Sequence, residues 1–296
     1  MRKKWLIALL GMLAATLIGA VVYLLPAHMQ VREVRPSLPD VSALRALTES
    51  DNKPVRVSAV LTSSQRSLRG SIGHHAVVVE WADGRLFLID AGMDAENAAE
   101  FGRLMELLWS SDPAEFHTTV FDALGERSSQ VAAVGFTHLH IDHVQGIELA
   151  CASEPPFVVV QSRHQRELQN MNTEESATIL ESCPRGEPID ADNLTEVPGF
   201  PGLAIYALGG HTPGSTLFAV AVDDQVLLFP GDITNAKSDL IHDRDKGFVY
   251  SFLLVPEDTA RTRDLRSWLR DMQDQADIHV YVSHDLADMR ELNRRF

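Results

Sequence analysis

The sequence feature that most restricts the fold is a dense run of histidine and aspartate, THLHIDHVQG at residues 137–146. Four side chains that can bind a metal fall within six positions: His138, His140, Asp142 and His143. The run ends a continuous apolar stretch, VAAVGFT, which predicts a buried strand. In an extended chain, side chains two positions apart point the same way, so His138 and His140 share one direction. The segment therefore predicts a metal site at the carboxyl end of a buried strand.

Three further side chains repeat the pattern of a polar ligand after an apolar strand. His211 lies in the glycine-rich loop GGHTPGS, Asp232 follows the apolar LLFP, and His284 ends the strand-like IHVYVSH. Taken singly, each would be interpreted as a turn former or a cap. Together with the first cluster, they predict that several strand ends meet at one edge of a layered structure and complete a metal site there.

The rest of the chain alternates strand-like and helix-like segments. Apolar runs typical of strands occur at residues 55–62, 75–81, 85–90, 157–161, 203–208, 216–222 and 225–230, besides those already named. Helical spacing of apolar residues marks 95–109 and 259–276. This order predicts an α/β fold in which helices cover sheets. Hydrophobic residues make up 45% of the 296 positions, enough for a sizeable core.

The N-terminal region differs from the rest. Residues 1–4 are basic, and residues 5–25 carry no charge over a length that lets a helix cross the ~30 Å hydrocarbon core of a bilayer. We interpret residues 5–25 as a transmembrane anchor, with a cleaved signal sequence or a buried core helix as alternatives. The basic flank places residues 1–4 in the cytoplasm. Residues 26–52 are polar and predict a tether. Residues 53–296 are then one folded domain in the periplasm or otherwise outside the cytoplasm, secreted if the signal is cleaved.

Charge and cysteine content narrow the partners. The chain has 41 acidic and 26 basic residues, a net charge of −15 at pH 7, so phosphate backbones would repel it and nucleic acid is not an expected partner. Its two cysteines, Cys151 and Cys183, lack the C-x-x-C spacing of a zinc site. They form either a disulfide, if the domain folds in an oxidising compartment, or two buried thiols. Nothing in the sequence indicates an oligomeric state.

Two motifs resemble those of a known family. HLHIDH at residues 138–143 resembles the H-x-H-x-D-H signature of the metallo-β-lactamase fold hydrolases, and LIDAGM, with Asp90 and Gly92, resembles an early strand-end motif of that family. The resemblance implies a four-layer αβ/βα sandwich with a two-metal site between its sheets. The ligands that it implies are His138, His140 and His211 for a first zinc ion, Asp142, His143 and His284 for a second, and Asp232 as a bridge between them.

A centre of that kind implies hydrolysis. Two dications about 3.5–4 Å apart lower the pKa of a bound water molecule and polarise a carbonyl. The resemblance thus suggests a small-molecule substrate that is an ester, lactone, thioester or amide. Asp142 or Asp232 would pass a proton to the leaving group.

Among the subfamilies, the order and spacing of the seven residues resemble the acyl-homoserine-lactone lactonases most. Class B β-lactamases lack a bridging aspartate at the position of Asp232. Glyoxalase-II-type thioesterases carry a C-terminal basic region for glutathione, which has no obvious equivalent here. The chain also departs from some lactonases, because it has Asn235 where they place a tyrosine three residues after the bridge.

The expected function is therefore a lactone- or ester-opening hydrolase. A thioesterase, a phosphodiesterase and a non-catalytic binding module on the same fold are the alternatives. The remaining histidines, including His74 and His75 before an expected strand, show no ligand pattern.

Overall fold

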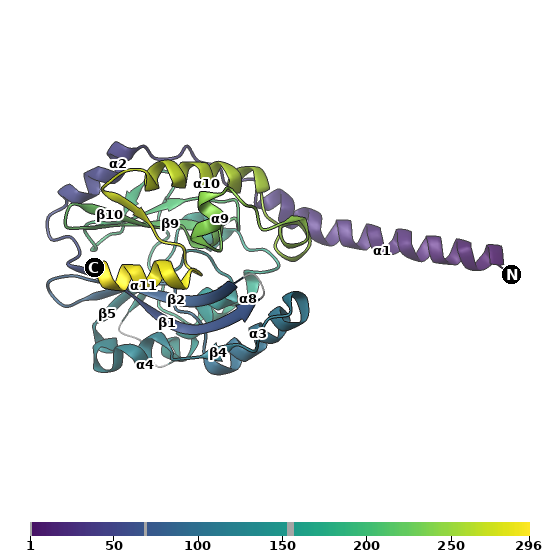
Figure 1. Cartoon of the computed structure of the whole chain (residues 1–296), viewed down its shortest axis with the longest axis horizontal. Coiled ribbons are helices and arrows are strands. Elements are labelled where there is room, and N and C mark those ends of the chain that lie inside the picture. Colours follow the sequence, from purple (N-terminus) through teal and green to yellow (C-terminus); the bar gives the residue numbers. More distant parts are fainter. Residues whose placement is uncertain (1, 68–69, 153–156) are drawn as a thin grey trace.

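The computed structural model describes residues 2–67, 70–152 and 157–296. Two β-sheets face each other, helices cover their outer sides, and α1 (Arg2–Gln30) projects from the folded body (Figure 1). The expected four-layer α/β sandwich is confirmed.

The first sheet has six strands in the order β4-β1-β2-β3-β5-β6. The strands are β1 (Arg56–Ser67), β2 (Gly70–Glu80), β3 (Leu86–Ile89), β4 (Glu115–Phe116), β5 (Val131–Gly135) and β6 (Val158–Val160). β1, β2 and β3 pair in antiparallel fashion, whereas β3, β5 and β6 run parallel. The carboxyl ends of β3 and β5 therefore meet at one edge of this sheet.

The second sheet has five strands in the order β11-β10-β9-β8-β7. The strands are β7 (Thr195–Glu196), β8 (Leu203–Ala207), β9 (Thr216–Val222), β10 (Gln225–Phe229) and β11 (Ile278–Val280). β10 and β11 are parallel, and β9 is antiparallel to both β8 and β10. The ends of β10 and β11 and the loop between β8 and β9 therefore lie along the same edge.

The central strands are buried on both faces, and alternate residues enter different cores. In β9, Phe218 and Val220 pack between the two sheets, whereas Leu217 and Ala219 pack beneath α10 (Thr259–Gln273). This division follows from the two-residue period of a strand. It also explains why these strands are continuous apolar runs in the sequence.

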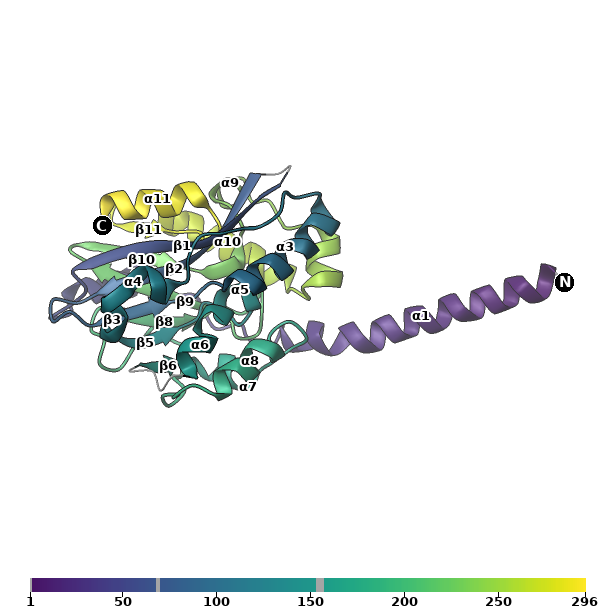
Figure 2. The same ribbon diagram turned by 90° about the horizontal axis from the view of Figure 1, so that it is seen from below.

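Helices cover the outer faces of the sheets (Figure 2). The remaining helices are α2 (Val41–Ala46), α3 (Ala95–Trp109), α4 (Val120–Leu124), α5 (Ile141–Val144), α6 (Glu148–Cys151), α7 (Arg163–Glu167), α8 (Glu174–Glu181), α9 (Lys237–Ile241) and α11 (Leu286–Arg295). Short helical turns are η1 (Leu47–Glu49), η2 (Gly125–Gln130), η3 (Gln145–Ile147), η4 (Gly231–Ile233) and the π-helical η5 (Val249–Leu254). Asp94 and Asp258 cap α3 and α10, because their side chains accept hydrogen bonds from backbone N–H groups of the first turn.

The sequence predicts that residues 26–52 are a tether, but in the structure much of this segment packs on the folded body. Leu44 and Leu47 are buried in the core beneath α10, and the indole N–H of Trp268 donates a hydrogen bond of 3.0 Å to the carbonyl of Pro39. Leu44 and Leu47 are three positions apart in a helical stretch and so enter the same core. The segment therefore packs on the folded body and joins α1 to it.

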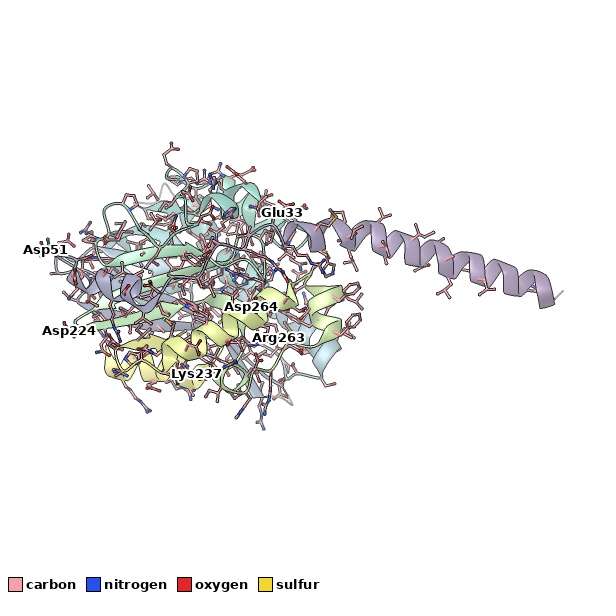
Figure 3. The ribbon with its side chains drawn as sticks, turned by 90° about the horizontal axis from the view of Figure 1, so that it is seen from above. Glu33, Asp51, Asp224, Lys237, Arg263 and Asp264 are labelled. Carbon is pink, nitrogen blue, oxygen red and sulfur yellow. A yellow bond between two sulfur atoms is a disulfide. The ribbon has the colours of Figure 1, made fainter. Side chains whose placement is uncertain are left out.

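The helix α1 is the part of the described chain that could cross a membrane by length and composition. Leu10–Gln30 has a mean hydropathy of 2.0, and 12% of the apolar window is buried against the protein. A signal sequence would meet the same criterion. Glu33 lies where α1 joins the body, whereas Asp51 and Asp224 lie at the opposite end (Figure 3).

Cys151 and Cys183 form a disulfide, with their Cα atoms 4.8 Å apart. Cys151 ends α6, and Cys183 follows α8, so the bridge ties the helix after the histidine cluster to the outer face of the first sheet. The sequence left open a disulfide or two buried thiols, and the structure has the disulfide.

Replacing both cysteines with serine should lower the free energy of unfolding by about 3–4 kcal/mol, because the cross-link closes a loop of 32 residues in the unfolded chain. Denaturant unfolding of the double variant and of the oxidised wild type measures the difference. Two titratable thiols in unreduced, unfolded wild-type protein would contradict the pairing.

Candidate metal centre

Loops at one edge of the two sheets bring together all seven side chains that the sequence predicts. The seven are His138 and His140 after β5, Asp142 and His143 in α5, His211 between β8 and β9, Asp232 in η4 after β10, and His284 after β11. All are buried except His140, which is half-buried. The parallel ends of β10 and β11 and the end of β5 explain why residues so distant in sequence meet here.

Three imidazoles form the first group of donor atoms. Nε2 of His138 lies 3.0 Å from Nδ1 of His140, which lies 3.2 Å from Nε2 of His211. Two nitrogens that bind one tetrahedral zinc ion are about 3.3 Å apart, given zinc–nitrogen distances of about 2.0–2.1 Å. The three nitrogens are therefore already spaced as ligands of a single ion.

A second group combines carboxylates with imidazoles. Nε2 of both His143 and His284 lies 3.6 Å from Oδ2 of Asp142. The carboxylate of Asp232 lies beside the same rings, with Oδ1 at 3.4 Å from His143 Nε2 and Oδ2 at 3.0 Å from His284 Nε2. Two carboxylates and two imidazoles thus face a common point.

The donor atoms of this second group fit a cation. Within the described residues, Nε2 of His143 and Oδ1 of Asp232 are buried and have no hydrogen-bond partner. A buried polar atom without a partner normally costs about 1–3 kcal/mol. Imidazole nitrogen and carboxylate oxygen are both zinc ligands, so a metal ion of this class would satisfy them.

The protonation states also suit a cation. Burial lowers the pKa of His138 and His211 and brings the pKa of His140 to about 3, so these rings are neutral at pH 7. Neutral imidazole is the form that binds metal. Burial opposes ionisation of Asp142 and Asp232, but neighbouring histidines outweigh it and hold the pKa of both carboxyls below the usual range.

The two imidazoles of the second group show the opposite shift. Burial disfavours their charged forms, but the carboxylates around them, chiefly Asp90 for His143 and Asp232 for His284, raise the pKa of both rings. Positive charge is therefore favoured at this point of the interior. A metal ion that binds there would displace those protons.

Asp90 explains the second motif of the sequence. Its carboxylate accepts a hydrogen bond of 2.9 Å from Nδ1 of His143 and one of 2.7 Å from the backbone N–H of Thr137. The first fixes the ring so that Nε2 faces the centre, and the second joins β3 to the start of the histidine loop.

Gly231 makes the approach of Asp232 possible. Its φ is +63°, and a Cβ atom there would lie 2.7 Å from Cβ of Thr137. A side chain at this position would therefore push β10 away from the histidine loop.

Glu257 and Lys246 are parts of the centre that sequence reasoning missed. Oε1 of Glu257 lies 2.5 Å from Nδ1 of His211, and Nζ of Lys246 lies 3.2 Å from the same oxygen. Ser251 donates a hydrogen bond of 2.6 Å to the other oxygen. Although burial opposes ionisation, Lys246 and His211 lower the pKa of Glu257 to about 2. An ionised Glu257 holds His211 with Nε2 toward the centre.

His74 was also missed. It lies in β2, is 4% exposed, and has its Nδ1 3.1 Å from Oδ2 of Asp142. The sequence places it in a strand before any ligand motif, and only the pairing of β2 within the sheet brings it to the centre.

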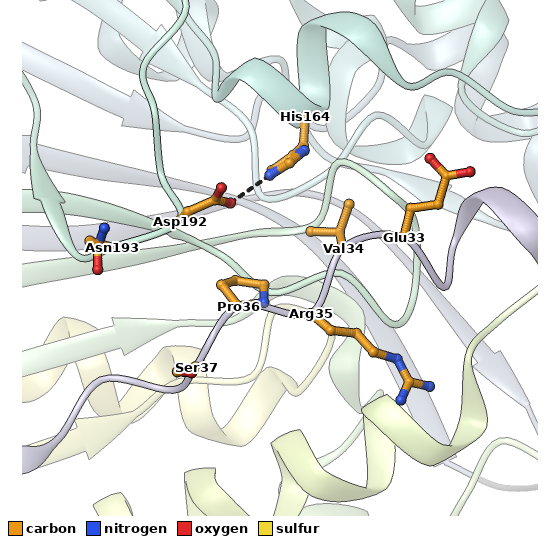
Figure 4. A pocket seen from close by; sticks show the side chains of 8 residues that line it. All are labelled: Glu33, Val34, Arg35, Pro36, Ser37, His164, Asp192 and Asn193. Atoms are coloured by element: carbon orange, nitrogen blue, oxygen red, sulfur yellow. Dashed lines mark hydrogen bonds and ion pairs between the residues drawn. The ribbon is translucent and has the colours of Figure 1, made fainter.

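A pocket of about 440 Å³ lies elsewhere, between residues 33–37 and the chain around Asp192 (Figure 4). His164 and Asp192 pair across it, with 2.6 Å between Nε2 and Oδ1. None of the seven predicted residues lines this pocket.

Comparison with known proteins agrees with the fold. The family model described as the metallo-beta-lactamase superfamily matches residues 69–284, and the chain belongs to this superfamily. A protein named "Probable metallo-hydrolase" from Mycobacterium tuberculosis is 24% identical over 265 residues, which is 82% of this chain and 81% of that protein. An identically named protein of Mycobacterium bovis matches equally. The superfamily match and the names of these relatives support a metal-dependent hydrolase.

Solved structures show the same fold at low sequence identity. One is an N-acyl homoserine lactone hydrolase with the product N-hexanoyl-L-homoserine at its catalytic metal centre; it has a TM-score of 0.59 and 15% identity, over 81% of this chain and 96% of that one. Another is AidC, a dizinc quorum-quenching lactonase, with a TM-score of 0.56 and 14% identity, over 81% and 92% of the two chains.

Replacing Glu257 with glutamine should weaken metal binding about 10–100-fold, because outer hydrogen bonds to a histidine ligand contribute on that scale. The variant keeps the size of the side chain and removes its charge. Competition with a chromophoric chelator measures the affinity. The exposed Glu187→Gln is the matched control, and equal affinities in the two variants would exclude this role for Glu257.

Proposed function

We propose that the protein is a di-zinc hydrolase that opens the carbonyl of a small-molecule ester or lactone. The observation that supports this is the place of Asp232 between the two groups of donor atoms. Its Oδ2 is 3.0 Å from Nε2 of His284, in the second group, and 3.9 Å from Nε2 of His211, in the first. A carboxylate in that position can join two ions. The lactonases of the same fold favour a lactone among the possible carbonyl substrates.

Two zinc-class ions bound there would lower the pKa of a water molecule and polarise the substrate carbonyl. The chain supplies the remaining functions. His138, His140 and His211 would hold one ion, and Asp142, His143 and His284 the other. Asp142 and Asp232 are ionised, so either carboxylate can accept a proton and pass it to the leaving group.

The surroundings of Tyr250 keep its phenol protonated. Burial, and then the charges of Glu257, Asp232 and Asp142, raise the pKa of its phenol well above the ordinary value. The phenol therefore stays protonated at neutral pH and can donate a hydrogen bond. It comes from a different part of the chain than Asn235, where some lactonases have their tyrosine.

The Asp232→Asn variant should lose a factor of about 10² or more in kcat/KM, about 2.7 kcal/mol, because it removes the bridging charge with little change of volume. Activity is measured on a panel of lactone, ester, thioester, phosphodiester and β-lactam substrates, together with the metal content by elemental analysis. We expect about two zinc-class ions per wild-type chain and hydrolysis of lactones or esters.

Asp224→Asn is the matched control, since Asp224 is exposed in the turn between β9 and β10. Turnover of Asp232→Asn equal to that of this control would remove Asp232 from the mechanism. Wild-type protein that binds no metal after supplementation would overturn the di-zinc proposal. Preferred turnover of thioesters or phosphodiesters would reassign the substrate.

We also propose that α1 anchors the protein in a membrane, with the domain in the periplasm or otherwise outside the cytoplasm. The length and hydropathy of Leu10–Gln30 support an anchor, and the basic residues 2–4 support its orientation. The Cys151–Cys183 disulfide supports an oxidising compartment. Cleavage of α1 as a signal would instead release the domain.

A further inference from the structure

His74 is fixed beside the second group of donor atoms by the backbone of its own strand. The backbone N–H of Gly73 donates a hydrogen bond of 3.0 Å to the carbonyl of His284, and the carbonyl of Gly73 accepts one of 2.9 Å from Nδ1 of His284. The rings of His74 and His284 then lie edge to face, 5.1 Å apart. Phe101 packs against the His74 ring at 5.3 Å. The two imidazoles are therefore held relative to each other before any ion binds.

The free atom of His74 points to the centre. Its Nδ1 is buried and has no hydrogen bond within the described residues, although Oδ2 of Asp142 is 3.1 Å away. The donor atoms of His74, Asp142 and His284 all lie within 4.8 Å of one another. Two ligands of one zinc ion are separated by up to about 4.2 Å, so only a small inward shift is needed. An imidazole nitrogen and a carboxylate oxygen 3.1 Å apart are close enough to bind one ion.

We propose that His74 is a further ligand of the second metal position, beside Asp142 and His284. The proposal rests on the di-metal centre proposed above. With His143 and Asp232, the second position then has five protein donors, whereas the first has three imidazoles and the shared Asp232. The second position is thus the more saturated of the two, and the first keeps more room for water or substrate.

The test compares His74→Ala with His75→Ala in the full-length chain. His75 is the adjacent residue, is similarly buried, and has its Nδ1 2.8 Å from the carbonyl of Ser283, so its loss controls for removing a buried imidazole from β2. Chelator competition gives the two metal dissociation constants, and X-ray absorption of the zinc-loaded proteins gives the number of imidazoles per zinc. His74→Gln, which keeps most of the volume, replaces His74→Ala if that variant does not fold.

Loss of His74 should weaken one of the two dissociation constants by more than about 100-fold, beyond the range of an outer hydrogen bond. It should also lower the imidazole count, and His75→Ala should change neither. Unchanged constants in the His74 variant would overturn the proposal. Weaker binding with an unchanged imidazole count would overturn it too, since His74 would then only position Asp142. These readouts need no substrate, so they separate this proposal from the assignment of the reaction.

A different observation concerns an apolar surface beside α1. The π-helical η5 exposes Val249, Phe252 and Leu253, and Phe248 directly before it is 71% exposed. The Phe248 and Phe252 rings stack at 5.0 Å. The ring of His28 in α1 stacks on Phe252 at 4.7 Å, so the surface is continuous with the inner end of the apolar helix.

The same segment reaches the metal centre from its other side. Lys246 donates a hydrogen bond of 2.5 Å to the carbonyl of Asp232, and Ser251 donates one to Glu257, which holds His211. Residues 246–257 therefore contact the centre through Lys246, Ser251 and Glu257 and also carry the apolar surface. Exposed Phe and Leu side chains next to an apolar helix are typical of a segment that lies in a lipid interface with its apolar face in the membrane.

We infer that Phe248, Val249, Phe252 and Leu253 lie in the interfacial layer of the bilayer that α1 crosses. This inference rests on the proposal that α1 is a membrane anchor. The test uses the full chain in phosphatidylcholine–phosphatidylglycerol nanodiscs, with nitroxide labels on single introduced cysteines, since the native cysteines are paired. The variants are Phe248→Cys, Val22→Cys in α1, and Asp51→Cys at the opposite end of the domain.

Labels at positions 22 and 248 should collide more often with oxygen than with a water-soluble nickel chelate, and the label at 51 should show the reverse. The inference would be wrong if the label at 22 is in lipid but the label at 248 is as accessible to nickel as the label at 51. The proposal that α1 is an anchor would then still stand. If the label at 22 is also accessible to the nickel chelate, both the inference and the membrane anchor would be wrong.

Discussion

The arrangement of the protein depends on two buried carboxylates, Asp142 and Asp232, at the edge where the sheets meet. Buried anions are costly unless they are paired, and here the imidazoles of His143 and His284 each lie within 3.6 Å of both carboxylates. Such a cluster must be held rigidly, because a small displacement leaves an unpaired charge. The structure meets this requirement by placing each side chain within a few residues of a buried strand, where the backbone is fixed by both sheets.

The strand ends are also why much of the centre could be predicted from the sequence. The strands are buried on both faces, so they are continuous apolar runs, and a histidine or aspartate directly after such a run is conspicuous. All seven predicted residues meet as a result. The predicted strands at 203–208, 216–222 and 225–230 likewise correspond to β8, β9 and β10 within a residue.

Residues that reach the centre by tertiary packing could not be predicted. Glu257 is 46 positions from His211 and follows no apolar strand, so only the docking of α10 places it there. His74 lies inside β2, and its neighbour His284 is 210 positions away in the sequence. Residues 26–52 show the same limit. Their few apolar side chains suggest a tether, and only the packing of this segment against α10, β9 and β10 makes Leu44 and Leu47 core residues.

The two halves of the centre therefore differ in how they are supported. His284 and His74 are locked by the backbone of β2, and His143 by Asp90 at the end of β3, all within the sheets. His211 is held by Glu257, whose other oxygen binds Ser251 of η5, and η5 contacts α1 through Phe252. Segments outside the sheets are the ones that move at low cost. The first group of donor atoms thus depends on α1 and η5 through Glu257 and His211, whereas the second group depends on the strands of the first sheet.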